Sequence, residues 1–99
     1  MKDVFMIHFT LPEHFNSEMW DVIPAQRVVV NELLEKRVIL NYSLDMDRRN
    51  LWVFMEGKDM AEINSIIRSF PIMKFVTVRI HELAFYDTAP VGLPELILN

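Results

Sequence analysis

The sequence predicts one α+β domain in which two helices cover a single face of a four-stranded antiparallel sheet. The chain has 99 residues, of which 52% are hydrophobic, enough for one domain with a small core. Apolar residues alternate with a period of two in four segments and recur at helical spacing in two others. The order of these segments is strand, helix, strand, strand, helix, strand, which is the ferredoxin-like, split βαβ arrangement.

The first strand is predicted over residues 3–10, where Leu11-Pro12 ends the alternation. Phe5, Ile7 and Phe9 point to one face of this strand. The opposite face carries Met6, His8 and Thr10.

The first helix is predicted over residues 16–36, with Asn16 or Ser17 as its N-cap. Pro24 interrupts the pattern, so it either kinks one helix or starts a second one. Beyond Pro24, the apolar stripe consists of Val29, Val30, Leu33 and Leu34.

Two strands follow over residues 38–45 and 50–56, with a turn over residues 46–49.

The second helix begins at Asp59, which forms a capping box with Glu62, and Pro71 ends it. Its apolar positions are Met60, Ile63, Ile66, Ile67 and Phe70. The last strand is predicted over residues 74–85, with Val76, Val78 and Ile80 on one face and Thr77, Arg79, His81 and Leu83 on the other.

Both faces of the predicted sheet carry bulky side chains. In the third strand Leu51, Val53 and Met55 occupy one face, while Trp52 and Phe54 occupy the other. In the second strand Leu40, Tyr42 and Leu44 are predicted to oppose Ile39. A sheet with two apolar faces needs two covers, so we expect a second copy of the chain to cover the open face and form a dimeric α+β barrel.

Residues 1–87 are predicted to form the single domain, and residues 88–99 a C-terminal tail. The tail is irregular around Pro90, Gly92 and Pro94 and ends in Leu96-Ile97-Leu98. We expect this apolar end to pack on a neighbouring subunit, in a homodimer or a higher homo-oligomer.

Composition excludes several classes of function. The net charge of −4 and the lack of a basic cluster argue against nucleic acid. No apolar run approaches the roughly 20 residues that cross a bilayer, and the N-terminus lacks a signal-peptide pattern, so we expect a soluble, cytoplasmic protein. The chain has no cysteine, two glycines and three histidines without paired spacing, so no cofactor and no metal are expected.

The chain resembles muconolactone isomerases of the dimeric α+β barrel group. The resemblance covers about 80 residues by eye. It rests on Leu11-Pro12, on the helix end Leu33-Leu34-Glu35-Lys36-Arg37, on the strand over residues 50–54, on the helix over residues 61–70 with the Phe70-Pro71 joint, and on the strand over residues 76–83. The segment over residues 41–49 departs from the family, because it has no counterpart of a Trp-Arg pair. The resemblance implies an intramolecular lactone isomerase that transfers a proton without a cofactor.

Candidate site residues follow from the strand faces. If Phe5, Ile7 and Phe9 pack under the helices, His8 points away from them, and so do Arg79 and His81 on the last strand. The spatial strand order 4-1-3-2 then brings His8 beside Arg79 and His81. An imidazole suits proton transfer and a guanidinium suits an anion, so His8 or His81 is the candidate proton carrier and Arg79 the anion clamp. The candidate substrate-binding residues are Tyr42, Trp52 and Met6, and His14 is expected to be solvated.

Two other functions remain open from the sequence. One is a cofactor-free monooxygenase of the same barrel fold, with Trp52, Tyr42 and Asn41 in its pocket. The other is a non-catalytic module that binds a small apolar or anionic organic ligand or assembles with itself, which the seven methionines favour.

Overall fold

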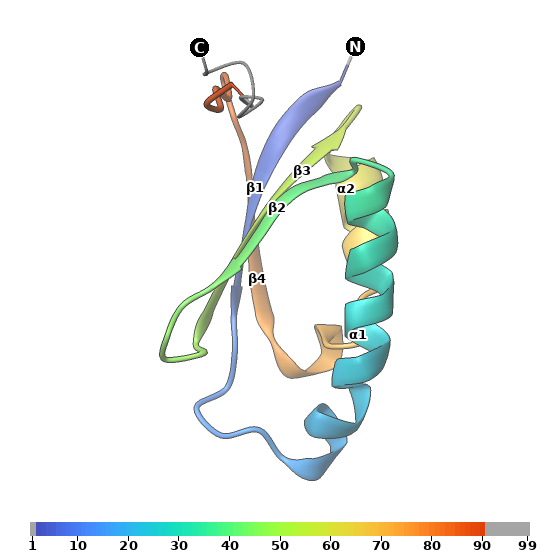
Figure 1. The fold of residues 1–99 in the computed structure, drawn as a ribbon, viewed down its shortest axis with the longest axis vertical. Helices are drawn as coiled ribbons and strands as arrows, with labels where there is room; N and C mark the ends of the chain where they lie inside the picture. The colour runs from blue at the N-terminus through green and yellow to red at the C-terminus, as the bar shows by residue number, and fades with distance from the viewer. Residues whose placement is uncertain (1, 91–99) are drawn as a thin grey trace, which may run out of the picture.

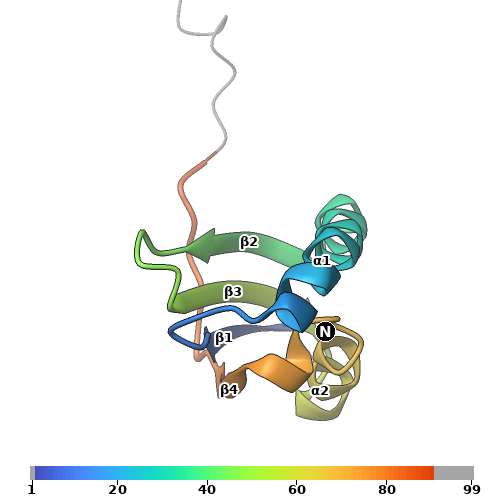
Figure 2. The same ribbon diagram turned by 90° about the horizontal axis from the view of Figure 1, so that it is seen from below.

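The computed structural model describes residues 2–90 and has two layers, a sheet and a pair of helices (Figures 1 and 2). The α+β class and the four-stranded antiparallel sheet are confirmed, and they are compatible with a ferredoxin-like arrangement. The elements are β1 (Asp3–Thr10), α1 (Ser17–Glu35), β2 (Ile39–Leu44), β3 (Asn50–Gly57), α2 (Met60–Ile67), a 3₁₀ helix η1 (Met73–Phe75) and β4 (Thr77–Glu82).

The strands lie in the order β2-β3-β1-β4, so β1 and β3 form the centre of the sheet. Figure 2 shows both helices on one side of this sheet. Phe5, Ile7 and Phe9 of β1 are fully buried on that side, as the alternation predicts. Burial of apolar surface drives folding, and these central strands contribute a large part of the core. The core also includes Met19, Val30, Leu51, Val53, Met55, Ile63, Ile67 and Phe70.

Helix α1 is continuous through Pro24, so the structure has one helix here and not two. The Asn16 side chain caps its start by accepting a hydrogen bond from the Met19 N–H at 2.9 Å. At its end, Arg37 adopts a left-handed conformation with φ of 60°. The N–H groups of Arg37 and Val38 then donate back to the carbonyls of Leu34 and Leu33, which is the Schellman ending of a helix.

Two predicted boundaries in the second half of the chain are wrong. Helix α2 ends at Ile67, before Pro71, and two hydrogen-bonded turns and η1 occupy the interval before β4. Strand β4 therefore spans only Thr77–Glu82 and not residues 74–85. The predicted cap is present: the Asp59 carboxylate accepts the Glu62 N–H at 2.9 Å, and the Glu62 carboxylate accepts the Lys58 N–H at 2.8 Å.

After β4 the chain runs back toward β2 on the side of the sheet away from the helices (Figure 2). Tyr86 lies there with its ring 5.3 Å from that of Phe54 on β3, and its hydroxyl accepts a 3.5 Å hydrogen bond from Asn41 on β2. The predicted tail begins within this segment, and residues 91–99 lie outside the described part of the chain. Within residues 2–90, neither helix is long and apolar enough to span a membrane.

Candidate functional site

A cavity of about 270 Å³ lies between the first half of α1 and the sheet. Its walls are mainly apolar, from Leu11, Met19, Ile23, Leu51 and Ile72. Four polar side chains also line it, namely Gln26, Arg27, Tyr42 and Arg48. An apolar cavity with a few converging polar groups is the usual form of a small-molecule site, and this one is near the lower end of the usual range of about 300–1,000 Å³.

A β-bulge in β2 turns Tyr42 into this cavity. The pairing of β2 with β3 shifts by one residue between Ile39 and Asn41. Tyr42 consequently pairs with Val53 and faces the helices, on the same side as Ile39. The prediction that Tyr42 opposes Ile39 is therefore wrong, because the extra residue reverses the alternation.

Tyr42 is held by two side chains of α1. The Gln26 side-chain amide donates to the Tyr42 hydroxyl at 3.3 Å. The Arg27 guanidinium lies 5.6 Å from the centre of the Tyr42 ring, which is a cation–π contact. Burial raises the pKa of Tyr42, while the Gln26 hydrogen bond and the Arg27 charge partly offset that rise. The hydroxyl is therefore protonated at neutral pH.

Arg48 enters the cavity from the turn between β2 and β3. Its φ is 57°, a left-handed conformation that is costly for a residue with a Cβ. The Asp45 carboxylate closes this turn by accepting the N–H groups of Arg49 and Asn50, at 2.9 and 3.1 Å. A non-glycine residue held at positive φ beside a cavity is a candidate functional residue.

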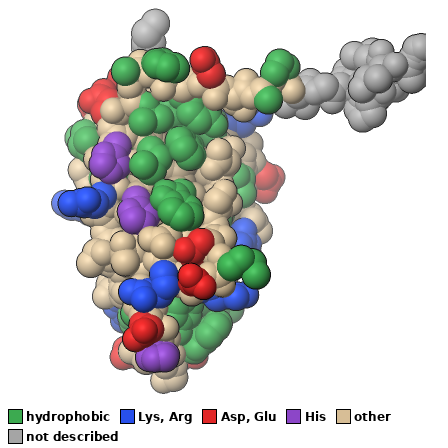
Figure 3. Space-filling model, turned by 90° about the vertical axis from the view of Figure 1, so that its left-hand side faces the viewer, with side chains coloured by type: hydrophobic (Ala, Val, Ile, Leu, Met, Phe, Trp, Pro, Cys, Tyr) green, Lys and Arg blue, Asp and Glu red, His purple; other side chains and the backbone are tan. Residues whose placement is uncertain are grey.

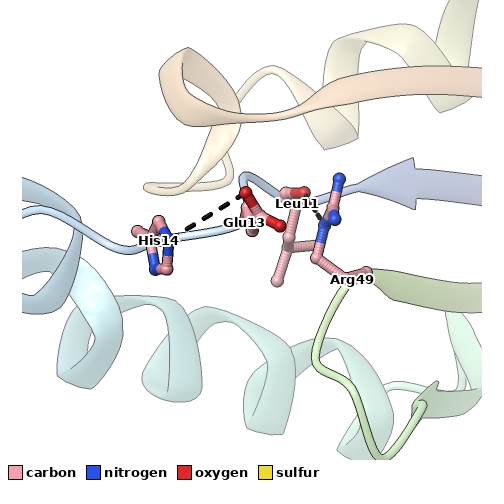
Figure 4. Close-up of polar contacts among 4 residues, drawn as sticks. All are labelled: Leu11, Glu13, His14 and Arg49. Atoms are coloured by element: carbon pink, nitrogen blue, oxygen red, sulfur yellow. Dashed lines mark hydrogen bonds and ion pairs between the residues drawn. The ribbon is translucent and has the colours of Figure 1, made fainter.

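Arg49 fastens the same turn to the end of β1 (Figure 4). Its Nε donates to the Leu11 carbonyl at 2.9 Å, and the Leu11 N–H donates to the Arg49 carbonyl at 2.8 Å. In the following loop, His14 Nε2 lies 3.9 Å from a carboxylate oxygen of Glu13, and both side chains are largely exposed. His14 is therefore solvated, as predicted. The reciprocal Leu11–Arg49 bonds hold the cavity wall that Leu11 and Arg48 share.

Two aromatic residues, Phe15 and Trp20, also line the cavity. The rings of Phe15 and Trp20 are 5.0 Å apart and tilted by 51°. Trp20 is 56% exposed, which is unusual for a tryptophan. Both residues also line a second hollow, which Arg48 lines as well. Phe15, Trp20 and Arg48 therefore line both hollows.

The predicted catalytic residues lie together on the other face of the sheet. His8 pairs with Arg79 on β4 and with Trp52 on β3, and Met6 pairs with His81. The expectation that His8 lies beside Arg79 is thus confirmed. Figure 3 views this face and shows histidine side chains beside a hydrophobic patch. The structure does not bring Tyr42 together with these residues, since Tyr42 faces the helices.

A hydrogen-bonded chain fixes the orientation of His8. The Asn50 side-chain N–H donates to the Asp45 carboxylate at 2.8 Å, so the Asn50 oxygen faces His8. That oxygen is 2.8 Å from His8 Nε2 and can only accept, so Nε2 carries the hydrogen. The His8 ring also stacks on Trp52, with centroids 5.7 Å apart. In neutral His8, Nδ1 is therefore the basic nitrogen.

The two faces differ in what they can do chemically. The cavity under α1 offers two guanidiniums and a phenol but no carboxylate or imidazole in its described lining, so it suits binding of an anion better than removal of a proton. The open face offers a base at His8 and a cation at Arg79. Residues 2–90 contain no group of three or more acidic, histidine or cysteine side chains placed to hold a metal ion.

Sequence reasoning missed Gln26, Arg27 and Arg48. One signal was available for Gln26, because it falls in register with the apolar positions of α1 and yet is polar. Those positions are Met19, Ile23, Val30 and Leu33. No comparable signal marks Arg48, whose role depends on the fold of the turn.

No protein-family model matches the chain, and no curated protein sequence matches it.

Proposed function

We propose that the protein binds a small organic anion with an apolar body in the cavity under α1. The observation that carries this proposal is that Arg27, Arg48 and Tyr42 all line one apolar cavity. A guanidinium gives a carboxylate charge-assisted hydrogen bonds, and Tyr42 adds a neutral donor. The apolar walls accept the rest of the ligand, whose size the volume of about 270 Å³ limits.

A thermal-shift screen tests this proposal. The panel contains benzoate, phenylacetate, muconate-like diacids, small lactones and phenols, each with an uncharged analogue where one exists. A ligand that binds only the folded state raises the unfolding midpoint. We expect monocarboxylates with an aromatic or alicyclic body to raise the unfolding midpoint more than their amides do. We expect Arg48→Gln to reduce the shift that the carboxylates cause, because their Kd rises by about tenfold. Equal shifts for acids and amides would contradict the proposal.

A second candidate function is proton transfer at the open face, as in a muconolactone isomerase. The specific support for it is the Asp45–Asn50–His8 chain, which leaves His8 Nδ1 as an oriented base beside Arg79. In this scheme Nδ1 removes a proton next to a lactone carbonyl and returns it one double bond away, while Arg79 holds the substrate carboxylate. His81 is the alternative proton carrier. His8→Ala should abolish turnover of muconolactone, and His14→Ala should leave it unchanged.

We also propose that a second copy of the chain covers the open face and completes a barrel. Supporting this are the partly exposed apolar side chains of that face, Met6, Trp52 and Phe54, beside polar His8 and Arg79. Trp52 remains 37% exposed at the centre of the sheet in one chain. Pairing two such faces removes this apolar surface from water and encloses His8. The cavity under α1 lies on the opposite side and stays open to its own ligand.

A further inference from the structure

Gln26 is a buried polar residue at the boundary between the helix layer and the sheet. It is 4% exposed, and among residues 2–90 it is the one polar side chain in the buried core. Buried amides are retained where every donor and acceptor is satisfied or where the orientation of a neighbour depends on them. Its contacts therefore bear on what the cavity can recognise.

The orientation of the Gln26 amide is set by the backbone. The Ile72 N–H, in the segment between α2 and η1, donates to Gln26 Oε1 at 3.3 Å. A backbone N–H can only donate, so the atom that faces it must be the amide oxygen. The amide nitrogen then faces Tyr42 and donates to its hydroxyl at 3.3 Å. Reversing the amide would place its nitrogen against the Ile72 N–H, donor against donor.

This arrangement determines which way the Tyr42 hydroxyl points. A phenol has one hydrogen to donate, and its oxygen here accepts from Gln26. The hydrogen of the hydroxyl is left for another partner. Within the described residues the Tyr42 oxygen has Gln26 as its hydrogen-bond partner, and Tyr42 lines the cavity. Burial raises the pKa of Tyr42, so the hydrogen is retained at neutral pH.

We propose that Gln26 is a positioning residue that commits the Tyr42 hydroxyl to donate into the cavity, so that the site selects ligands presenting a carboxylate or carbonyl oxygen there. This inference rests on the proposed binding function and adds that Tyr42 donates a hydrogen bond to the ligand instead of accepting one. A ligand that presents only donors, such as a protonated amine, meets a donor at Tyr42 and two cations at Arg27 and Arg48. The site rejects such a ligand, because the polar groups on both sides are left unpaired.

A purely structural role for Gln26 predicts a different result. In that case the amide only ties α1 to β2 and to the segment at Ile72, and replacing it changes stability but not selectivity. The two roles separate when affinity is compared between ligands that differ only in an acceptor oxygen. Acetophenone and α-methylstyrene form such a pair, since a carbonyl in one replaces a vinylidene group of nearly the same shape in the other.

Gln26→Glu reverses the hydrogen bond without changing the shape of the side chain. An ionised Glu at this position still accepts from Ile72 N–H, but it offers no donor, so the Tyr42 hydroxyl must donate to it. We expect the full-length variant at pH 8 to bind acetophenone about 3- to 10-fold more weakly than the unaltered protein, with little change for α-methylstyrene. At a pH low enough to protonate the new carboxyl group, it regains a donor, and acetophenone affinity recovers.

Tyr42→Phe is the second variant, in case a carboxylate at position 26 prevents folding. It removes the donor while keeping the ring under Arg27, so acetophenone should lose the same affinity and α-methylstyrene should not. Isothermal titration gives the Kd values, and circular dichroism checks the fold of each variant. If the unaltered protein prefers acetophenone and both folded variants keep that preference, the inference about Gln26 and Tyr42 is wrong while the binding function stands. If the unaltered protein binds neither compound nor benzoate, both proposals are overturned.

Discussion

The imidazole of His8 on β1 lies 2.8 Å from the side-chain oxygen of Asn50 at the start of β3. Asn50 also donates to Asp45, so one residue joins the open face of the sheet to the β2–β3 turn. The same turn presents Arg48 to the cavity on the other side. The hairpin is therefore the element that both candidate sites share.

Replacing Asn50 by Ala should destabilise the hairpin. The change removes the acceptor of His8 and the side-chain donor to Asp45, and leaving partly buried polar groups unpaired costs about 1–3 kcal/mol. Urea unfolding measures the free energy. Asn41→Ala is the matched control, because Asn41 is exposed and makes a longer bond of 3.5 Å to Tyr86. We expect that control to stay within about 0.5 kcal/mol of the unaltered protein.

Asp45 should make stability depend on pH in the acid range. Hydrogen bonds from the Asn50 side chain, and then from the backbone of Asn50 and Arg49, lower the pKa of Asp45 below its ordinary value of 3.8. As pH falls, the Asp45 carboxylate is protonated in the unfolded state before it is protonated in the folded state. The contribution of Asp45 to the free energy of unfolding is therefore complete well above pH 3.8, and it is lost as pH falls through the lower pKa of the folded state. Asp45→Ala should therefore show a shallower loss of stability between about pH 5 and pH 2.

The control for that experiment is Asp47→Ala, in the same turn. Asp47 is exposed and accepts no side-chain hydrogen bond within residues 2–90, so its variant should lose stability with acid as steeply as the unaltered protein. If the stability of the Asp45 and Asp47 variants falls equally steeply with pH, Asp45 does not stabilise the turn through its lowered pKa.

Arg48→Gly should separate the needs of the fold from those of the site. Glycine adopts a φ of 57° without steric strain from a Cβ, which stabilises the folded state. The greater conformational freedom of glycine in the unfolded chain partly offsets this gain, so the protein should become more stable by less than about 1 kcal/mol. Affinity for benzoate should fall about tenfold, since a guanidinium leaves the cavity. Thermal unfolding and isothermal titration measure the two effects.

Arg37→Gly is the matched variant, because Arg37 has a φ of 60° at the end of α1 and does not line the cavity. It should change stability in the same way and leave benzoate affinity unchanged. Loss of affinity in both variants would indicate a general effect of surface charge instead of a contact in the cavity.

Trp52→Glu should prevent self-association through the open face. The change replaces an apolar indole by a charged group, which is costly to bury, and Trp52 lies at the centre of that face. We expect sedimentation velocity to give a dimer or larger species for the unaltered protein and a monomer for this variant. Met46→Glu is the control, since Met46 is 93% exposed in the turn away from the sheet. A monomeric unaltered protein would refute pairing through this face.

The sequence was a good guide wherever a strand pairs regularly. Alternation along β1 and β3 correctly places Phe5 and His8 on opposite faces, and likewise Val53 and Trp52, but it left open which face meets the helices. It failed at β2, because a bulge inserts one residue and nothing in Leu40-Asn41 marks it. That single residue moves Tyr42 to the helix side and separates it from the other predicted site residues.

The cavity was beyond sequence reasoning for a related reason. Gln26, Tyr42 and Ile72 come from three segments that are distant in the chain, and only the packing of α1 on the sheet brings them into contact. Arg48 depends on a turn conformation that its own residue type disfavours. Periodicity identifies the face on which a side chain lies, but it does not identify the neighbours it meets across two layers.

The central claim is that the cavity under α1 is the ligand site, and chemical-shift mapping by NMR tests it most directly. Benzoate is titrated into ¹⁵N-labelled protein, and shifts are followed at the backbone amides and at the Gln26 side-chain amide. We predict that the perturbed amides cluster around Gln26, Tyr42 and Arg48, with little change at His8 and Arg79. Perturbations confined to His8, Arg79 and Trp52, or none at any concentration, would contradict it.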